Sequence, residues 1–361
     1  TFIYLNLELA ADRRIFESNL PAASVLQRIY LEKGTQKQGD TLIFIDEIQN
    51  SPKAVELMRY FYEDFPDLFV ISAGSLLEIM IDTHKISFPV GRVEYRYLFP
   101  LSFLEYLGAL DEQKAITAFS TLPVPGWAQD RLFELFHQYT LTGGMPETVD
   151  RYSKTRDITS ISAVYQGLIS AYKDDVSKYA KTTTEVTVIR HIIETAATEA
   201  GGRITFERFG NSPYRSREVG NALRTLERAM LMYLVYPSTN TMPPVIADLK
   251  RKPRLQFIDT GLMNFCANIQ AQYFTVDDLN ALYRGKLTEH IVAQEFMAME
   301  TTYIKKPVFW VRELKQSSAE VDFLVPYRNK IIPVEVKSGK EGTLRSLHSF
   351  IDMSGCSLAV R

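Results

Sequence analysis

Cysteine, excess charge and long apolar runs are all scarce in this sequence, and each scarcity excludes a class of protein. Its two cysteines, Cys266 and Cys356, provide neither a disulfide framework nor a cysteine-based zinc site. The formal net charge of −2 argues against a protein that coats nucleic acid with its whole surface, although a local basic face stays open. No apolar run approaches the roughly 18 residues of a transmembrane helix, and we expect no signal peptide. We therefore expect a cytoplasmic protein without a membrane partner.

The composition is that of a soluble globular protein with sizeable cores. Hydrophobic residues make up 46% and charged residues 23% of the 361 residues, and this length favours two to three domains. The five histidines are scattered without the spacing of a metal site. The sequence begins at Thr1 inside a strand-like stretch and ends at Arg361 inside an apolar run, so we expect both ends to be truncations of a longer protein.

The most informative stretch is Thr41–Asn50, TLIFIDEIQN. Its apolar run, Leu42–Ile45, predicts a strand buried on both faces, as in a parallel sheet. The run ends on Asp46 and Glu47, and ligands of open parallel sheets gather at the carboxyl ends of strands. One such acid can hold Mg²⁺ while the other orients water for attack on a phosphate. The alternative is a buried strand that ends in a solvated acidic pair.

Residues 1–105 alternate strand and helix patterns, which favours an α/β fold with a parallel sheet. A helix is expected after Ser51-Pro52, because apolar residues recur there at helical spacing. Ser75 follows the third strand and could contact a phosphate or the attacking water, or be part of a simple turn. Arg92 or Arg96 could reach a phosphate in cis or from a neighbouring subunit, or be a surface arginine. The expected strands are Phe2–Leu7, Leu42–Ile45 and Leu68–Ser72.

Four ordered landmarks, IDEIQ, ISAGS, the Gly91-Arg92 pair and LFPLSFLEYL, together resemble the AAA+ superfamily of P-loop ATPases. The resemblance is to the bacterial and archaeal branch that carries a nuclease-like C-terminal domain. It implies that ATP and Mg²⁺ are bound, with Asp46 holding the Mg²⁺ that accompanies ATP. It also implies that Glu47 polarises the hydrolytic water, that Ser75 is the polar sensor and that Arg92 is the arginine of the GR element.

The phosphate-binding loop of such an ATPase is missing from the sequence. The motif G-x-x-x-x-G-K-[ST] supplies backbone N–H groups and a lysine to the phosphates, and it should precede the Phe2–Leu7 strand. No glycine in residues 1–361 is followed by the required Lys-Ser/Thr. We expect the loop to lie before residue 1; the other possibility is that the molecule has lost it.

Residues 106–185 are expected to form a helical lid. The apolar stripe of Arg131–Thr140 is typical of a helix packed in a core. Thr142–Glu147 contains a turn that resembles the GG-x-P turn in the lid of the same family. Ile158–Tyr179 has a further long helical pattern, and no chemistry is assigned to this region.

Residues 186–255 favour a module that is similar to a winged helix. Val188–Ala200 is one amphipathic helix, and Ser216 is the expected N-cap of a second helix. Met232–Val235 and a segment near Val245–Ala247 could form the wing. The module could contact phosphates or serve protein packing, because a fold alone does not establish DNA binding. Six arginines lie between residues 201 and 228, at positions 203, 208, 215, 217, 224 and 228.

Residues 256–361 contain a second acidic pattern. Val321–Val325 is expected to be a strand with Asp322 inside it, and a turn at Tyr327–Lys330 returns the chain to a strand that carries Glu335 and Lys337. A hairpin would bring these three side chains to one site. Two carboxylates and a lysine can bind Mg²⁺ and activate water on a phosphodiester, and a buried Asp without such a role is costly.

This pattern, after a helix with Glu289, resembles the PD-(D/E)XK nuclease core, a restriction-endonuclease-like α/β domain. The resemblance implies a Mg²⁺ site at Asp322 and Glu335, catalytic roles for Glu289 and Lys337, and an accessory role for Lys315 or Gln316. The alternative is a nuclease-like fold without cleavage, stabilised by a network of Asp, Lys and Glu ion pairs.

Three functions are compatible with these patterns. The first is an ATP-binding AAA+ ATPase that couples hydrolysis to a C-terminal nuclease-like domain engaging DNA or a partner protein. The second is a Mg²⁺-dependent DNA nuclease regulated by the ATPase half. The third is a non-catalytic interaction protein. A homo-oligomer is expected if an arginine completes the site of a neighbouring subunit.

Overall fold

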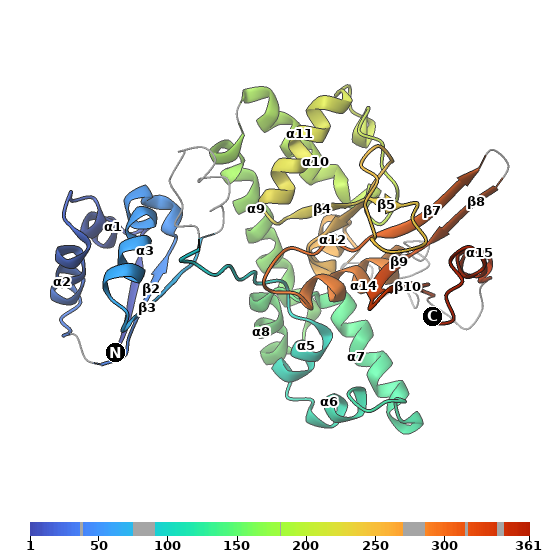
Figure 1. Ribbon diagram of the computed structural model, residues 1–361, viewed down its shortest axis with the longest axis horizontal. Coiled ribbons are helices and arrows are strands. Elements are labelled where there is room, and N and C mark those ends of the chain that lie inside the picture. Colours follow the sequence, from blue (N-terminus) through green and yellow to red (C-terminus); the bar gives the residue numbers. More distant parts are fainter. Residues whose placement is uncertain (37–38, 75–90, 181, 270–285, 315–316, 338–342) are drawn as a thin grey trace. The chain divides into compact units, whose positions relative to one another are not determined.

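The structure is a computed structural model that describes residues 1–361 except 37–38, 75–90, 181, 270–285, 315–316 and 338–342. The described residues form two compact units, Thr1–Tyr95 and Arg96–Arg361, which we call the N-terminal and C-terminal units (Figure 1). Three residues to which the sequence assigned roles, Ser75, Lys315 and Gln316, lie outside the described residues.

The N-terminal unit contains a three-stranded parallel sheet, as predicted. Its strands are β1 (Phe2–Asn6), β2 (Thr41–Asp46) and β3 (Leu68–Ser72), with β2 in the middle. The connecting helices are α1 (Ala10–Phe16), α2 (Ala22–Glu32), the short η1 (Ile48–Asn50) and α3 (Pro52–Asp64). The predicted start of α3 is confirmed, because the Ser51 hydroxyl accepts a hydrogen bond from the backbone N–H of Ala54 at 3.2 Å.

Among the described residues, the sheet of this unit is well covered on one face only, so the prediction of a strand buried on both faces is wrong. Along β2, fully buried residues such as Ile43 and Ile45 alternate with half-buried ones. The buried residues pack on the apolar sides of α1, α2 and α3 in a single core. On the opposite face Phe2 of β1 and Phe69 of β3 are 63% and 56% exposed. An apolar run therefore indicated the strand but not how many of its faces are packed.

The first part of the C-terminal unit is helical, as predicted. Short helices and a buried turn separate the longer helices α7 and α9 (Figure 1). The elements are α5 (Phe103–Ala109), α6 (Gln113–Phe119), η2 (Gly126–Ala128), α7 (Gln129–Thr142), α8 (Pro146–Thr155), η3 (Ile158–Ile161) and α9 (Ser162–Tyr179).

Two longer helices follow, α10 (Thr183–Glu199) and α11 (Ser216–Arg228), and the segment between them contains the short η4 (Phe209–Asn211). Ser216 is the first residue of α11 rather than its N-cap, because the Glu218 carboxylate accepts a hydrogen bond from the N–H of Arg215 at 2.9 Å and caps the helix instead.

Two strands pair after α11, but only one of them is where the sequence placed it. The strand β4 (Met232–Val235) pairs antiparallel with β6 (Arg254–Phe257), while the two-residue β5 (Pro237–Ser238) joins another sheet. The expected second wing strand near Val245–Ala247 has no strand structure. All four residues of β6 are buried. The sequence did not predict this strand, because two of its four residues, Arg254 and Gln256, are polar.

The last part of the unit combines two helices with short antiparallel pairs. After α12 (Thr260–Cys266) and α14 (Lys286–Ala298), β7 (Phe309–Leu314) pairs with β5 and with β8 (Ser317–Val321). The strands β9 (Phe323–Tyr327) and β10 (Lys330–Val334) form a hairpin, and α15 (Arg345–Ser354) follows. The predicted strand Val321–Val325 is therefore two strands that meet at Asp322.

A buried carboxylate connects the glycine turn after α7 to α12. Asp259 is fully buried and accepts hydrogen bonds from the N–H of Gly144 at 2.6 Å, from Leu262 N–H at 2.8 Å and from the Tyr165 hydroxyl at 2.9 Å. Gly143 adopts φ +74°, and a Cβ at this position would collide with the Asp259 carboxylate and the Tyr165 hydroxyl. The sequence therefore needs glycine here for both conformation and space.

A half-buried carboxylate connects α14 to the beginning of α5. Glu295 accepts hydrogen bonds from the N–H of Phe103 at 2.9 Å and from the Tyr139 hydroxyl at 2.7 Å. Burial raises the pKa of Glu295. Through these contacts, the segment that the sequence grouped with the ATPase landmarks packs within the C-terminal unit.

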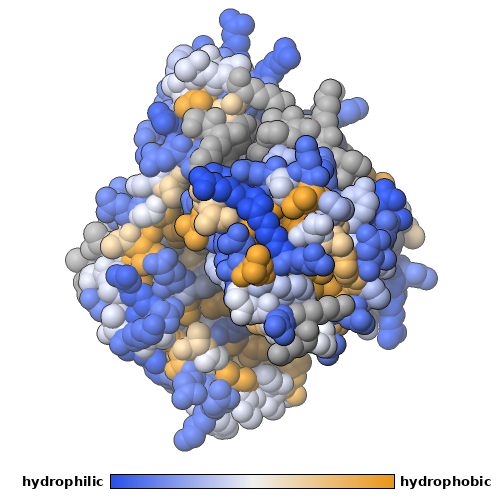
Figure 2. Space-filling model, turned by 90° about the vertical axis from the view of Figure 1, so that its left-hand side faces the viewer, coloured by the Kyte–Doolittle hydropathy of each residue, from blue (hydrophilic) through white to orange (hydrophobic). Residues whose placement is uncertain are grey.

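Among the described residues, no helix combines the length and the apolarity that crossing a membrane requires. The face shown in Figure 2 is mainly hydrophilic, and its apolar residues form separate patches among hydrophilic ones.

We predict that Gly143→Ala destabilises the C-terminal unit by about 1–3 kcal/mol, because alanine is strained at positive φ and its Cβ would displace the Asp259 carboxylate. Urea unfolding of the purified chain measures the effect. The control is Gly167→Ala within α9, where a Cβ meets nothing within 4 Å. That change should be neutral or stabilising by about 0.5–1 kcal/mol. Equal stability of the two variants would contradict the argument.

Candidate functional site

The carboxyl ends of the three parallel strands lie at one edge of the N-terminal sheet. Asn6 pairs with Asp46 in register, and Ile45 pairs with Ser72. The N–H of Ile48 donates to the carbonyl of Ala73 at 3.0 Å, which joins η1 to the residues after β3. The pairing therefore places the acidic pair next to the end of β3, as the sequence predicted for a parallel sheet.

Asp46 and Glu47 are half-buried at this edge and are held by neutral donors. The Tyr4 hydroxyl donates to Asp46 Oδ2 at 2.7 Å, which raises the pKa of Tyr4, and the N–H of Glu47 donates to Asp46 Oδ1 at 3.0 Å. Glu47 has φ 52° and ψ 44°, in the left-handed region that few non-glycine residues adopt. This conformation turns the chain sharply between β2 and η1. Strain of this kind is often found at functional sites.

Gln49 contacts Glu47, and the sequence analysis did not single it out. Its amide Nε2 donates to Glu47 Oε2, and its Oε1 lies so close to Gly74 that a Cβ there would collide with it. The Oε1 atom is buried and has no hydrogen-bond partner among the described residues. Gln49 thus positions the carboxylate of Glu47 and packs against the end of β3. The signal in the sequence was its place in IDEIQ, two residues after the glutamate.

Arg92 lies at the other end of α3 from this edge. Its Nε donates to Glu63 Oε1 at 2.8 Å, near the C-terminal end of the helix. The helix begins at Pro52, next to η1, and at about 1.5 Å per residue roughly 16 Å of helix separates the two ends. Within one chain, Arg92 is therefore not brought together with Asp46 and Glu47. The prediction that it acts on the site of a neighbouring subunit stays a prediction.

The second acidic pattern is brought together by the β9–β10 hairpin. Phe323 pairs with Val334, so Asp322 and Glu335 are opposite each other at the next position. The N–H of Val336 donates to Asp322 Oδ2 at 2.9 Å, and Lys337 Nζ lies 2.6 Å from Glu335 Oε1. The predicted proximity of the two carboxylates and the lysine agrees with this register, although Asp322 lies at a strand break and not within a strand.

A buried arginine that the sequence analysis did not identify lies among these carboxylates. The Arg254 side chain is 6% exposed and comes from β6. Its guanidinium is 2.9 Å from Glu289 Oε2 and 3.3 Å from Asp322 Oδ1, and it also binds Glu320. It lies over the ring of Phe309, 4.5 Å from the centroid. Arg254 is therefore the cation around which three carboxylates are gathered.

The ionisable groups of this cluster shift one another's pKa values. Burial alone would lower the pKa of Arg254, but Glu289, Glu320 and Asp322 outweigh it and the net shift is upward. Burial raises the pKa of Glu289 to about 7, against the opposing effect of Arg254. Burial also raises the pKa of Glu335, whose Oε2 is buried and has no hydrogen-bond partner among the described residues.

This arrangement favours an ion-paired cluster over a metal site. In the described part of the chain, no group of three or more His, Cys, Asp or Glu side chains is arranged to hold a metal ion. Three of the acids instead contact a guanidinium. Arg254 could have been suspected from the sequence, because a basic residue begins an apolar strand, RLQF, that precedes α12. Nothing in the sequence, however, indicated that this strand passes next to Asp322, about 70 residues later.

Comparisons with known proteins add a family assignment for parts of the chain. Residues 1–107 match the model of a family described as an AAA domain, so this part of the chain is similar to AAA-type ATPase domains. Residues 133–273 match a domain of unknown function, DUF8612, and residues 284–358 match another, DUF4143.

Among solved structures, a Walker-type ATPase of Pyrococcus abyssi matches with 15% sequence identity and a TM-score of 0.44, over 74% of this chain and 84% of that chain. No curated protein matches the sequence.

We predict that Arg254→Met destabilises the C-terminal unit by about 3–5 kcal/mol, because Glu289, Glu320 and Asp322 would lose their buried counter-charge. Burial already raises the pKa of Glu289, and loss of the opposing effect of Arg254 raises it further, so the variant loses stability as pH increases. Urea unfolding at pH 5 and pH 8 should therefore show the larger deficit at pH 8. The exposed Arg151→Met in α8 is the control, expected within about 0.5 kcal/mol of wild type.

We predict that Glu289→Gln becomes increasingly stable relative to wild type as pH rises. The pKa of Glu289 is about 7 in the folded protein and about 4.3 when unfolded, so its contribution is fully present below pH 4.3 and is lost as pH rises through 7. Glutamine resembles the protonated acid and avoids this loss, which we expect to reach about 1–3 kcal/mol. The exposed Glu147→Gln is the control. A constant difference between pH 4.5 and 7.5 would contradict the assignment.

Proposed function

We propose that this chain carries the water-activating part of an AAA-type ATPase, with hydrolysis of ATP as its reaction. The observation that supports the proposal most directly is the placement of Asp46 and Glu47 at the carboxyl edge of a parallel sheet, within residues that match an AAA domain. Ligands of such sheets bind at this edge. The two acids are adjacent in sequence but differ in their contacts, which suits them to different roles.

Asp46 is the proposed ligand of the Mg²⁺ that accompanies ATP. Its two oxygens accept hydrogen bonds from Tyr4 and from the N–H of Glu47, and it makes no ion pair within the described residues. Each carboxylate oxygen retains a further lone pair, and oxygen donors are the ligands that Mg²⁺ requires. The donor set therefore fits the ion. When bound, Mg²⁺ would neutralise charge on the phosphate oxygens.

Glu47 is proposed to orient and polarise the attacking water, with Gln49 as its positioning residue. The left-handed backbone of Glu47 and the hydrogen bond from Gln49 fix its carboxylate without neutralising it. Such fixation favours catalysis, because a general base works best when its geometry is set before the substrate arrives. Ser75 remains the proposed sensor, and Arg92 the proposed contribution to the site of a neighbouring subunit in a homo-oligomer.

For the C-terminal unit, we favour engagement of a partner over cleavage of DNA. The juxtaposition of Asp322, Glu335 and Lys337 supports a Mg²⁺-dependent nuclease as a second candidate. Cleavage would however require Mg²⁺ to displace Arg254 from Asp322 and Glu289. That exchange is unfavourable, because a buried arginine without its partners is costly. A non-catalytic interaction role for this unit therefore agrees better with the contacts.

We predict that Glu47→Gln lowers the rate of ATP hydrolysis by about 10²–10⁴-fold while nucleotide binding is retained. The assay uses protein expressed from its complete gene, because no stretch of residues 1–361 has the phosphate-binding motif. Phosphate release measures hydrolysis, and a fluorescent ATP analogue measures binding. Glu56→Gln, an exposed change on α3, is the matched control and should hydrolyse ATP like wild type. Hydrolysis that survives Glu47→Gln would overturn the proposal.

A further inference from the structure

We propose that Tyr4 is a positioning residue for the Mg²⁺ that accompanies ATP, and that it acts through the carboxylate of Asp46. This inference rests on the proposed function, because it adds a further side chain to the same site. The hydroxyl of Tyr4 donates a hydrogen bond to Asp46 Oδ2 at 2.7 Å. Groups that contact a metal ligand, rather than the metal, set the orientation of the ligand and thereby raise the affinity for the ion.

The pairing of β1 with β2 brings the Tyr4 hydroxyl to this carboxylate. In the parallel register Tyr4 is opposite Phe44, and Asn6 is opposite Asp46. Alternate residues of a strand share one face of the sheet, so Tyr4 and Asp46 are diagonal neighbours on the same face. The Tyr4 ring also stacks on the Phe44 ring, with 5.9 Å between the centroids and 16° between the planes. Because this contact limits movement of the ring, the hydroxyl has a set position next to Asp46.

Three hydrogen bonds together fix Asp46. The N–H of Leu7 donates to its carbonyl oxygen at 3.0 Å, and the N–H of Glu47 donates to Oδ1 at 3.0 Å. Tyr4 binds the other carboxylate oxygen, so rotation of the carboxylate would break two contacts at once. Tyr4 supplies the side-chain donor of this set. Its contact can therefore be removed by a substitution that leaves the backbone bonds in place.

Asp12, another carboxylate of the N-terminal unit, has a different kind of partner. It is buried, accepts a hydrogen bond from the N–H of Asn6 at 2.9 Å and pairs with Lys33 at 2.6 Å. The lysine neutralises Asp12, whereas a tyrosine hydroxyl is uncharged near pH 7 and leaves the negative charge of Asp46 in place. Tyr4 thus orients Asp46 without competing with a cation for its charge.

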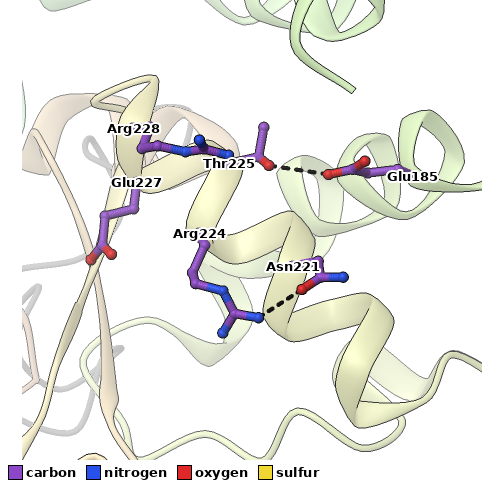
Figure 3. Close-up of a pocket in the computed structure, with 6 residues that line it drawn as sticks. All are labelled: Glu185, Asn221, Arg224, Thr225, Glu227 and Arg228. Carbon is purple, nitrogen blue, oxygen red and sulfur yellow. Dashed lines mark hydrogen bonds between the residues drawn. The ribbon is translucent and has the colours of Figure 1, made fainter. Parts of the chain in front are cut away.

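A hollow of about 500 Å³ in the C-terminal unit does not offer Mg²⁺ an alternative site (Figure 3). Its lining includes two carboxylates and two guanidinium groups, those of Glu185, Glu227, Arg224 and Arg228. Glu227 also pairs with Lys306 at 2.6 Å. The arginines balance the carboxylates, so the hollow does not attract a cation. We therefore expect the Mg²⁺ dependence of nucleotide binding to report on Asp46.

Binding of a fluorescent ATP analogue, in EDTA and at increasing Mg²⁺ concentrations, tests the inference on protein expressed from its complete gene. We expect Tyr4→Phe to need about tenfold more Mg²⁺ than wild type for the half-maximal gain in affinity, because loss of a contact to a metal ligand weakens metal binding by this order. Affinity for the analogue in EDTA should be unchanged, since the hydroxyl acts on the ligand of the ion. Phenylalanine retains the ring that stacks on Phe44.

Two comparisons make the test specific. Tyr60→Phe in α3 is the matched control, because Tyr60 is 48% exposed and Tyr4 is 46% exposed, and it should need as much Mg²⁺ as wild type. Asp46→Asn, alone and combined with Tyr4→Phe, shows whether the hydroxyl acts through Asp46. If it does, adding Tyr4→Phe to Asp46→Asn changes the Mg²⁺ requirement no further.

Three results would overturn the inference. They are an equal Mg²⁺ requirement in Tyr4→Phe and wild type, an equal loss of affinity by Tyr4→Phe with and without Mg²⁺, and a further loss when Tyr4→Phe is added to Asp46→Asn. In each case wild type still binds the analogue, so the ATPase proposal stands. Failure of wild type to bind the analogue at any Mg²⁺ concentration would overturn both proposals, and the two kinds of failure are therefore distinguishable.

Discussion

The contacts of Arg254 constrain much of the C-terminal unit. One guanidinium from β6 contacts Glu289 on α14, Glu320 on β8 and Asp322 at the β8–β9 break, and it covers the Phe309 ring of β7. A buried charge is tolerated only when its partners are in place. The contacts of this one side chain therefore link α14, β6, β7 and β8, in addition to the backbone pairing of the strands.

The sequence predicted the N-terminal unit more completely than the C-terminal unit, for a physical reason. In residues 1–95, the strands Phe2–Asn6, Thr41–Asp46 and Leu68–Ser72 and the helix after Ser51 are formed by local patterns, and parallel pairing then follows from the alternation of strand and helix. Local patterns could not predict which faces of the sheet are packed against helices. Whether Phe69 faces a helix or solvent depends on the number of helices that pack on each face.

In the C-terminal unit, the decisive contacts join residues that are far apart in sequence. Asp259 binds Gly144, and Glu295 binds the beginning of α5, 192 residues away. The hairpin that joins Asp322 and Glu335 was predictable, because the turn between them is local. The arginine that pairs with Asp322 was not, because its strand, β6, lies about 70 residues before the hairpin in the sequence. The pattern of two acids and a lysine was therefore recognisable, while its chemical meaning depended on a residue outside the pattern.

The two acidic sites show that a pattern of carboxylates does not by itself define a reaction. Asp46 and Glu47 are held by a hydroxyl, a backbone N–H and an amide, none of which carries charge. Asp322 is held by a guanidinium that already occupies the position a cation would take. Neutral donors orient a carboxylate and leave its negative charge available to a metal ion or a water molecule. A buried arginine instead neutralises that charge by forming an ion pair. The chemistry is therefore expected where the acids lack a cation of their own, at the edge of the N-terminal sheet.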